Sequence, residues 1–250
     1  MCCFTNAVSV SHTSIFARDA GNDRQFLVYA MKVKAAAEVA MVLPIPVPRG
    51  SGEQAVTFID LSDYPLIFAD LFSAMGFMGF AGSEDGAKPA PAAPTPLVVQ
   101  QVGAFEASFV PTIADFNRLD QRFQLPAGTW EKLPAYRDYG FAVFKLKAGE
   151  QKIHPMAFSF PRSDPSALFF PTVHIHDGAV HEQADFDHTL FAQTGDRHPQ
   201  GAEAWAESQA LAGREVDIKR AAGIVAGDQH VYYRTLKGKL PNQDTVLKFG

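Results

Sequence analysis

Three histidines near residue 178 are the side chains of this sequence best suited to chemistry. Residues 173–181 read VHIHDGAVH, with an Asp-Gly pair between two alternating runs. Asp-Gly predicts a two-residue hairpin turn, because a type I′ turn requires positive φ at both central residues. That register places His174, His176 and His181 on one face and the aliphatic side chains on the other. Three imidazoles on a rigid hairpin can bind a transition metal.

Two other interpretations of these histidines stay open. A half-exposed strand can carry histidines on its solvated face with no chemical role. A shift of one residue in the pairing would also move alternate side chains to opposite faces and separate the three rings. The metal site therefore depends on the predicted turn.

Two adjacent cysteines at the amino terminus are the second group with reactive potential. Cys2 and Cys3 are the only cysteines of the chain, and neighbours in sequence rarely form a disulfide, so no disulfide framework is expected. Removal of Met1 would leave Cys2 with a free α-amine beside its thiol, a pair that can act as base and nucleophile or chelate a metal. A frayed terminus with two idle thiols is the alternative.

The candidate metal ligands are the three hairpin histidines, both cysteines and His154, which begins a predicted strand. Thiolate and imidazole together favour copper or zinc over magnesium or calcium.

Composition and charge narrow the class of protein. The 250 residues are 47% hydrophobic and 20% charged, which is ordinary for a globular protein. A net charge of −5 argues against a nucleic-acid or anionic-membrane partner. The sequence has no apolar run of eighteen residues, so no transmembrane helix is predicted, and its first residues lack the pattern of a signal peptide. We therefore expect a cytoplasmic protein.

Hydrophobic periodicity predicts an α+β fold, mainly antiparallel β-sheet with a few short helices. Helices are expected near 65–75, 112–123 and 201–212, with a short one around 128–138. Strands are expected at 25–34, 38–43, 55–60, 97–109, 140–147 and 153–160, in two short pieces within 2–17, and around 215–225 and 229–236. Prolines at positions 44, 46 and 48 cannot donate to a ladder, so the piece that ends the strand at 38–43 is expected to be an extended edge or a polyproline segment.

A stretch rich in Gly, Pro and Ala divides the chain. Residues 83–96 predict a flexible linker loop between an N-terminal β-rich half, 1–82, and a C-terminal α+β half, 97–250, that carries the histidine hairpin.

Short matches in series along residues 2–172 resemble a bacterial family known only as domain of unknown function 2330. The matching pieces are Cys2-Cys3-Phe4, Leu43-Pro44-Ile45-Pro46, Val102-Gly103-Ala104-Phe105, Leu125-Pro126, Tyr139 to Lys147, and Pro155 to Pro161. The resemblance implies an N-terminal cysteine and a similar series of strands, but no reaction. Members of that family are usually exported, whereas no signal sequence is expected for this chain, and its histidine hairpin has no counterpart in the family.

Three functions are compatible with these features. The first is a metal-binding protein, such as a copper or zinc metalloenzyme, acting on a small-molecule or peptide substrate. The second is an N-terminal-nucleophile hydrolase in which Cys2 attacks an amide. The opening Cys2, followed by Arg18-Asp19, loosely resembles the start of cysteine-type amide hydrolases. The third is a binding domain without catalysis. The oligomeric state is not predicted.

Overall fold

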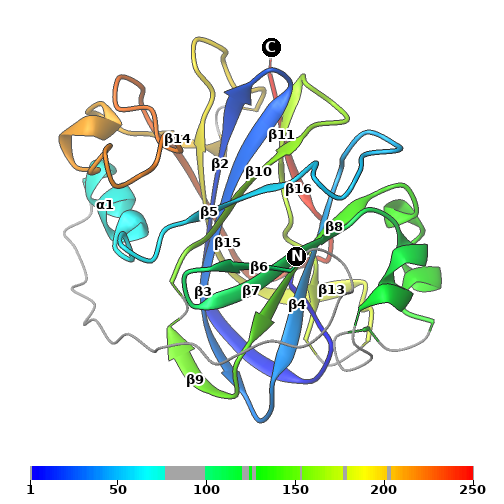
Figure 1. Cartoon of the computed structure of the whole chain (residues 1–250). Helices are drawn as coiled ribbons and strands as arrows, with labels where there is room; N and C mark the ends of the chain where they lie inside the picture. The colour runs from blue at the N-terminus through cyan, green and yellow to red at the C-terminus, as the bar shows by residue number, and fades with distance from the viewer. Residues whose placement is uncertain are drawn as a thin grey trace.

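The structure is a computed structural model that describes residues 2–76, 99–119, 124–125, 128–152, 154–176, 179–201 and 204–249. The predicted linker, 83–96, lies outside these residues. The described residues form a six-stranded, an eight-stranded and a two-stranded sheet (Figure 1). Among the described residues, no helix has the length and apolar character that a transmembrane span requires.

The six-stranded sheet has the order β12-β1-β4-β8-β7-β6. Its strands are β12 (His174–Ile175), β1 (Cys2–Phe4), β4 (Val39–Ile45), β8 (Gly140–Leu146), β7 (Phe105–Val110) and β6 (Val99–Val102). Adjacent strands are antiparallel except that β1 pairs with β12 in parallel.

The eight-stranded sheet has the order β14-β15-β13-β2-β3-β10-β5, with β9 on a further part of β3. Its strands are β14 (Ala206–Glu207), β15 (Tyr232–Pro241), β13 (Gln183–Gln193), β2 (Val8–Gly21), β3 (Arg24–Ala35), β10 (Met156–Pro161), β5 (Thr57–Asp60) and β9 (Gly149–Lys152). The pairing of β13 with β2 is parallel. The small sheet joins β11 (Ala167–Phe170) to β16 (Thr245–Lys248).

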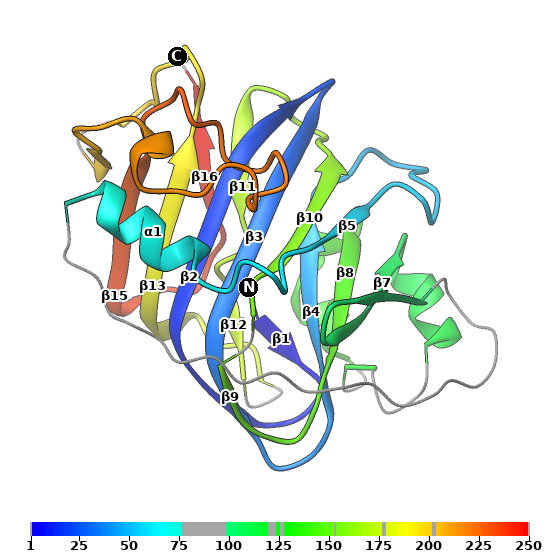
Figure 2. The ribbon, with the colours of Figure 1, turned by 60° about the vertical axis from the view of Figure 1, so that its left-hand side comes forward.

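Helical structure is short. The α-helix α1 (Ile67–Ala74) lies over the eight-stranded sheet (Figure 2), where Leu71 packs with Val28 and Phe191. The 3-10 helices are η1 (Ile113–Arg118), η3 (Trp130–Lys132), η4 (Pro134–Tyr136) and η6 (Ala212–Arg214). Side chains from η1 and η4 cover the outer face of the six-stranded sheet.

The main core lies between the two large sheets, and its inner side chains follow the strand alternation. In β8, Phe144 faces this core while Val143 faces the outer cluster beneath η1 and η4. In β3, Tyr29 faces the main core while Val28 faces the cluster beneath α1. Strands covered on both faces read as nearly continuous apolar runs, because side chains of both parities must be buried.

The predicted α+β class is wrong: the described part of the chain is mostly β-sheet, with 46% of the described residues in strands and 11% helical. Within the predicted helix over 201–212, the described residues include β14 and the start of η6 and form no α-helix. Two of their backbone N–H groups bond to another segment instead of to the preceding turn, since Ser208 donates to the Val231 carbonyl and Ala212 to the Gln229 carbonyl. The Ser208 hydroxyl also donates to the Ala210 carbonyl, a local bond that competes with a helix.

The helix expected over 112–123 is also shorter in the described residues, where η1 ends at Arg118. The predicted helix over 65–75 is confirmed by α1. The two halves inferred from the sequence share both large sheets, because β4 pairs with β8 and β2 pairs with β13 across the segment 83–96.

Candidate functional site

A cluster of three imidazoles lies where the six-stranded and eight-stranded sheets meet. His174 belongs to β12, His176 follows that strand, and His188 lies in the middle of β13. The alternation along β13 directs Phe186, His188 and Leu190 to the same inner side. His174 therefore contacts both the Phe186 ring, at 4.5 Å between centroids, and the His188 ring, at 4.6 Å.

The contact between His174 and His188 is close and not that of a simple hydrogen bond. The Nε2 atom of His174 lies 3.2 Å from Nε2 and 3.4 Å from Nδ1 of His188. The two rings are nearly perpendicular, at 80°. Because both His188 nitrogens are almost equally distant, neither is placed for one linear N–H···N bond.

His176 contacts the same cluster in a different way. Its ring stacks on His174 with centroids 4.7 Å apart and an angle of 27° between the planes, and it meets the edge of Phe4. A metal binds in the plane of an imidazole ring, so two stacked rings do not converge on one ion. Among the described residues, no three His, Cys, Asp or Glu side chains are arranged to hold a metal.

Burial keeps the two contacting histidines neutral. Desolvation, followed by the charge of His176, lowers the pKa of His174 to about 3. Desolvation, followed by the charge of His174, lowers the pKa of His188 to about 2. At neutral pH both rings therefore keep a lone pair on one nitrogen.

Two half-buried polar side chains of the segment after β15 hold β12 in place. The Asn242 amide accepts from the His174 N–H at 2.7 Å and donates to the His174 carbonyl at 2.9 Å. The Asp244 carboxylate accepts from the N–H groups of Thr172 and Val173 and from the Tyr136 hydroxyl. These bonds fix the backbone that carries the cluster.

The predicted histidine hairpin differs from the observed arrangement. β12 pairs in parallel with β1, with Cys2 opposite His174 and Cys3 opposite Ile175. His181 is exposed, and its carbonyl accepts from Asn242. The turn residues 177–178 lie outside the described residues. The backbone N–H and C=O of His174, which the predicted hairpin would pair with His181, instead bond to the Asn242 side chain.

The alternation inferred for this segment nevertheless places its aliphatic side chains correctly. Val173 and Ile175 are buried in the outer core of the six-stranded sheet. A register counted from the Asp-Gly turn reaches only to residue 181 and therefore does not place His188 in the site. The alternation of Phe186, His188 and Leu190 is the signal that could have placed it on a buried face.

Both cysteines lie in β1, the strand that pairs with the histidine-bearing strand β12. Cys3 is fully buried in the outer core with Ile175, on the side opposite the imidazoles. Cys2 lies in β1 in register with His174, and its side chain is outside the described part of the structure. A role of Cys2 as ligand or nucleophile stays a prediction.

His154 lies at a separate place, against β6 and β7. Its Nε2 accepts from the Ala104 N–H at 3.0 Å, and its Nδ1 lies 3.2 Å from the Pro155 carbonyl. The ring stacks on Phe105 with centroids 4.1 Å apart. With both ring nitrogens in hydrogen bonds, His154 holds the β6–β7 turn and has no free lone pair for a metal.

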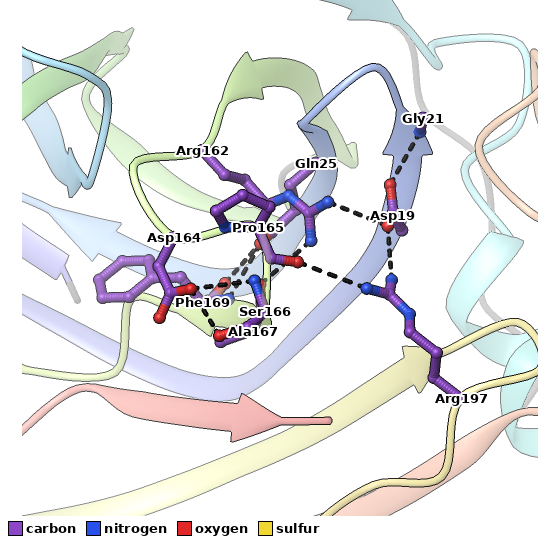
Figure 3. Close-up of polar contacts among 10 residues, drawn as sticks. All are labelled: Asp19, Gly21, Gln25, Arg162, Asp164, Pro165, Ser166, Ala167, Phe169 and Arg197. Atoms are coloured by element: carbon purple, nitrogen blue, oxygen red, sulfur yellow. Dashed lines mark hydrogen bonds and ion pairs between the residues drawn. The ribbon is translucent and has the colours of Figure 1, made fainter. Parts of the chain in front are cut away.

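A second polar cluster surrounds Asp19 at the end of β2 (Figure 3). One carboxylate oxygen of Asp19 accepts from Arg162 at 2.9 Å and from Arg197 at 2.5 Å, and the other accepts from the Gly21 N–H. The Arg162 side chain is only 4% exposed, and its Nε has no hydrogen-bond partner among the described residues. Burial acts to raise the pKa of Asp19, but the Gly21 N–H and the two guanidinium groups outweigh it and lower the pKa.

Replacing Asp19 by Asn should destabilise the fold by about 2–3 kcal/mol, because Arg162 would be left buried without its counter-charge. Urea unfolding of both proteins at neutral pH would measure this. Asp138→Asn is the matched control, since the Arg49–Asp138 pair is largely exposed and its loss should change stability little. Equal stabilities of the wild type and Asp19→Asn would contradict this account.

Arg18, which precedes Asp19 in the sequence, also makes hydrogen bonds and a ring contact within the fold. The Arg18 guanidinium donates to the carbonyls of Ile224 and Gly223 and lies over the Phe26 ring. Arg18 thus ties β2 to the loop before β15 instead of facing Cys2.

Comparison with known proteins adds a fold relationship. No protein-family model matches the chain, and no curated protein matches it. Among solved structures, the crystal structure of baculovirus P35 matches with a TM-score of 0.52 and 14% identity, covering 99% of each chain. A mutated baculovirus P35 after caspase cleavage matches with a TM-score of 0.51 and 14% identity, covering 96% of this chain and 100% of that one. The chain has a P35-like fold. The resemblance to domain of unknown function 2330 stays a prediction.

Proposed function

We propose that this chain is a protein ligand of a caspase-type cysteine protease, which cleaves it after Asp85. The observation that carries this proposal is the match of fold along the whole chain to P35, one of whose structures is that of the caspase-cleaved protein. At 14% identity the match supports the proposal through the fold alone.

The sequence of the connection between α1 and β6 is compatible with such cleavage. Caspases hydrolyse the peptide bond that follows an aspartate, and Asp85 is the only aspartate between Gly76 and Val99. Gly86 follows it, so the residue after the cleaved bond carries no side chain that could obstruct the protease.

The arrangement of strands predicts what cleavage would leave behind. Both large sheets combine strands from before and after the segment 83–96. The two products would therefore stay associated through β4–β8 and β2–β13 under native conditions. Because its two fragments stay together, a cleaved protein of this kind can remain bound to the protease. The products of an ordinary substrate need not stay together.

Incubating the purified chain with active caspases of different specificities tests the proposal. We expect one cut, with mass spectrometry of the denatured products giving a fragment that ends at Asp85, and a loss of caspase activity on a fluorogenic peptide. Asp85→Ala should abolish both effects, whereas the upstream control Asp63→Ala, at an exposed position before α1, should behave as the wild type. An intact chain and unchanged activity with every caspase would refute the proposal.

A further inference from the structure

A long loop between β14 and β15 is fixed on the eight-stranded sheet beside α1 (Figures 1 and 2). Of residues 208–231, only those of η6 have regular structure. Ordered loops of this length in compact domains usually have a function. The Gln193 side chain bonds to both backbone groups of Ala226, and the Arg18 guanidinium donates to the Ile224 carbonyl. The loop therefore presents a fixed surface to solvent.

Two glycines bring the ends of this loop together beside a surface hollow of about 760 Å³. The Gly213 N–H donates to the Gly227 carbonyl at 2.9 Å, and a Cβ atom on Gly213 would lie only 2.9 Å from the same oxygen. Only glycine allows the two backbones to approach this closely, and neither residue has a side chain that could fill the space beside the contact. The hollow is also lined by Ala210, Leu211, Arg214 and His230.

Leu211 and Arg214 give the hollow an apolar group and a cationic group. Leu211 is 44% exposed, one of three large hydrophobic side chains that are exposed among the described residues. The Arg214 side chain is 76% exposed, and its Nε lies 3.9 Å from the Glu215 carboxylate, too far for a hydrogen bond. A guanidinium binds a carboxylate through two parallel hydrogen bonds. None of the described residues that line the hollow is acidic, so its charge favours an anionic group.

His230 adds a hydrogen-bonding group at the same place. Its Nδ1 lies 2.7 Å from the Ser208 carbonyl, so Nδ1 is the donor and the ring is held in position. In the neutral ring Nε2 is then an acceptor, which a backbone N–H of an extended chain can satisfy. An apolar contact, a cation and an acceptor together match a peptide better than an inorganic anion, which would use the cation alone.

We propose that this hollow binds an extended segment of a partner protein in which a glutamate or aspartate neighbours an apolar side chain. Leu211 contacts the apolar side chain, Arg214 binds the carboxylate, and His230 accepts from the backbone. A second copy of this chain is a poor occupant, because a two-fold contact would bring the two Arg214 side chains together. Since the loop is already fixed, little of the binding free energy is lost in ordering it.

The test uses the isotope-labelled full chain and a blocked peptide of alternating leucine and glutamate, followed by NMR of the backbone amides. The peptide should shift the signals of residues 209–214 and 227–230 in a saturable way. Leu211→Ser and Arg214→Gln should each weaken binding about fivefold or more. Both side chains are exposed, so neither change should affect folding.

Matched control variants lie elsewhere on the surface. Val246 in β16 is 49% exposed, and the Arg137 side chain is 77% exposed beside the acidic residue that follows it, as Arg214 is. Val246→Ser and Arg137→Gln should bind the peptide like the wild type.

Control ligands separate the contributions of the two groups. A peptide with glutamine in place of glutamate, one with serine in place of leucine, and sodium acetate should all bind more weakly than the leucine–glutamate peptide. Equal binding of any of these, shifts confined to other parts of the chain, or no shift at millimolar peptide would overturn the proposal. The measurement involves no protease, so its outcome is independent of cleavage after Asp85.

Discussion

Lowering the pH from 7 to 5 should cost the folded state on the order of 3 kcal/mol through His174 and His188 alone. Burial lowers the pKa of His174 to about 3 and that of His188 to about 2, from an ordinary value of 6.5. The unfolded chain therefore takes up protons below pH 6.5 that the folded chain does not. Each histidine stabilises the fold fully above pH 6.5 and loses that contribution as the pH falls toward its folded pKa. The figure is reduced from the full shift because His174 is partly solvated.

Chemical denaturation at several pH values in a chelator measures this effect. The wild type should lose stability between pH 7 and 5, and a His174→Gln/His188→Phe double variant should show a much shallower dependence. His230→Gln should keep the wild-type slope. Asp244 acts in the opposite direction, because burial raises the pKa of its carboxyl group, and it is unchanged in all three proteins. Parallel slopes for the wild type and the double variant would show that the two imidazoles are not the cause.

Replacing Phe158 by Ala should destabilise the fold by about 3–5 kcal/mol, the usual cost of removing a buried aromatic ring from a packed core. Phe158 lies in β10, is fully buried, and its ring contacts Phe58, Phe144 and Phe160 at centroid distances of 5.9–6.0 Å. These rings come from both large sheets, so the cavity would open between layers that cannot collapse onto each other without moving whole strands.

Urea unfolding monitored by far-ultraviolet circular dichroism would give the loss of stability. Val246→Ala is the control, since Val246 in β16 is 49% exposed and its truncation should change stability by less than about 0.5 kcal/mol. A loss below about 1 kcal/mol for Phe158→Ala would mean that this aromatic cluster is not tightly packed.

Elements governed by their own periodicity could be predicted from the sequence. The alternation over 25–34 and 140–147 corresponds to β3 and β8, and the apolar helix pattern at 65–75 corresponds to α1. Pro44 is an instructive intermediate case, because β4 lies inside its sheet, yet β1 pairs only with residues 41–42 of it. The proline therefore occupies a part of the strand that is an edge on one side, as its missing N–H requires.

Features that depend on distant partners could not be predicted. The segment 201–212 has a helical composition, but the N–H groups of Ser208 and Ala212 bond to the carbonyls of Val231 and Gln229, which no local pattern reveals. The imidazole cluster forms because β12 pairs with β1 and lies beside β13, so that His188 takes the place predicted for His181. The sequence therefore indicates that histidines form the site. Which histidines come together depends on how the strands pair in the folded chain.

The parallel pairing of β2 with β13 fixes an order of events during synthesis. β2 ends at Gly21, and the strand that completes its other side begins at Gln183. Almost three quarters of the chain must therefore be synthesised before β13 can cover the open side of the hairpin formed by β2 and β3. Until then a long apolar strand keeps an open edge, which is a site for misassociation with other chains. A protein of this topology gains its stability late, and cells that make it must protect that edge for the time a ribosome needs to add some 160 residues.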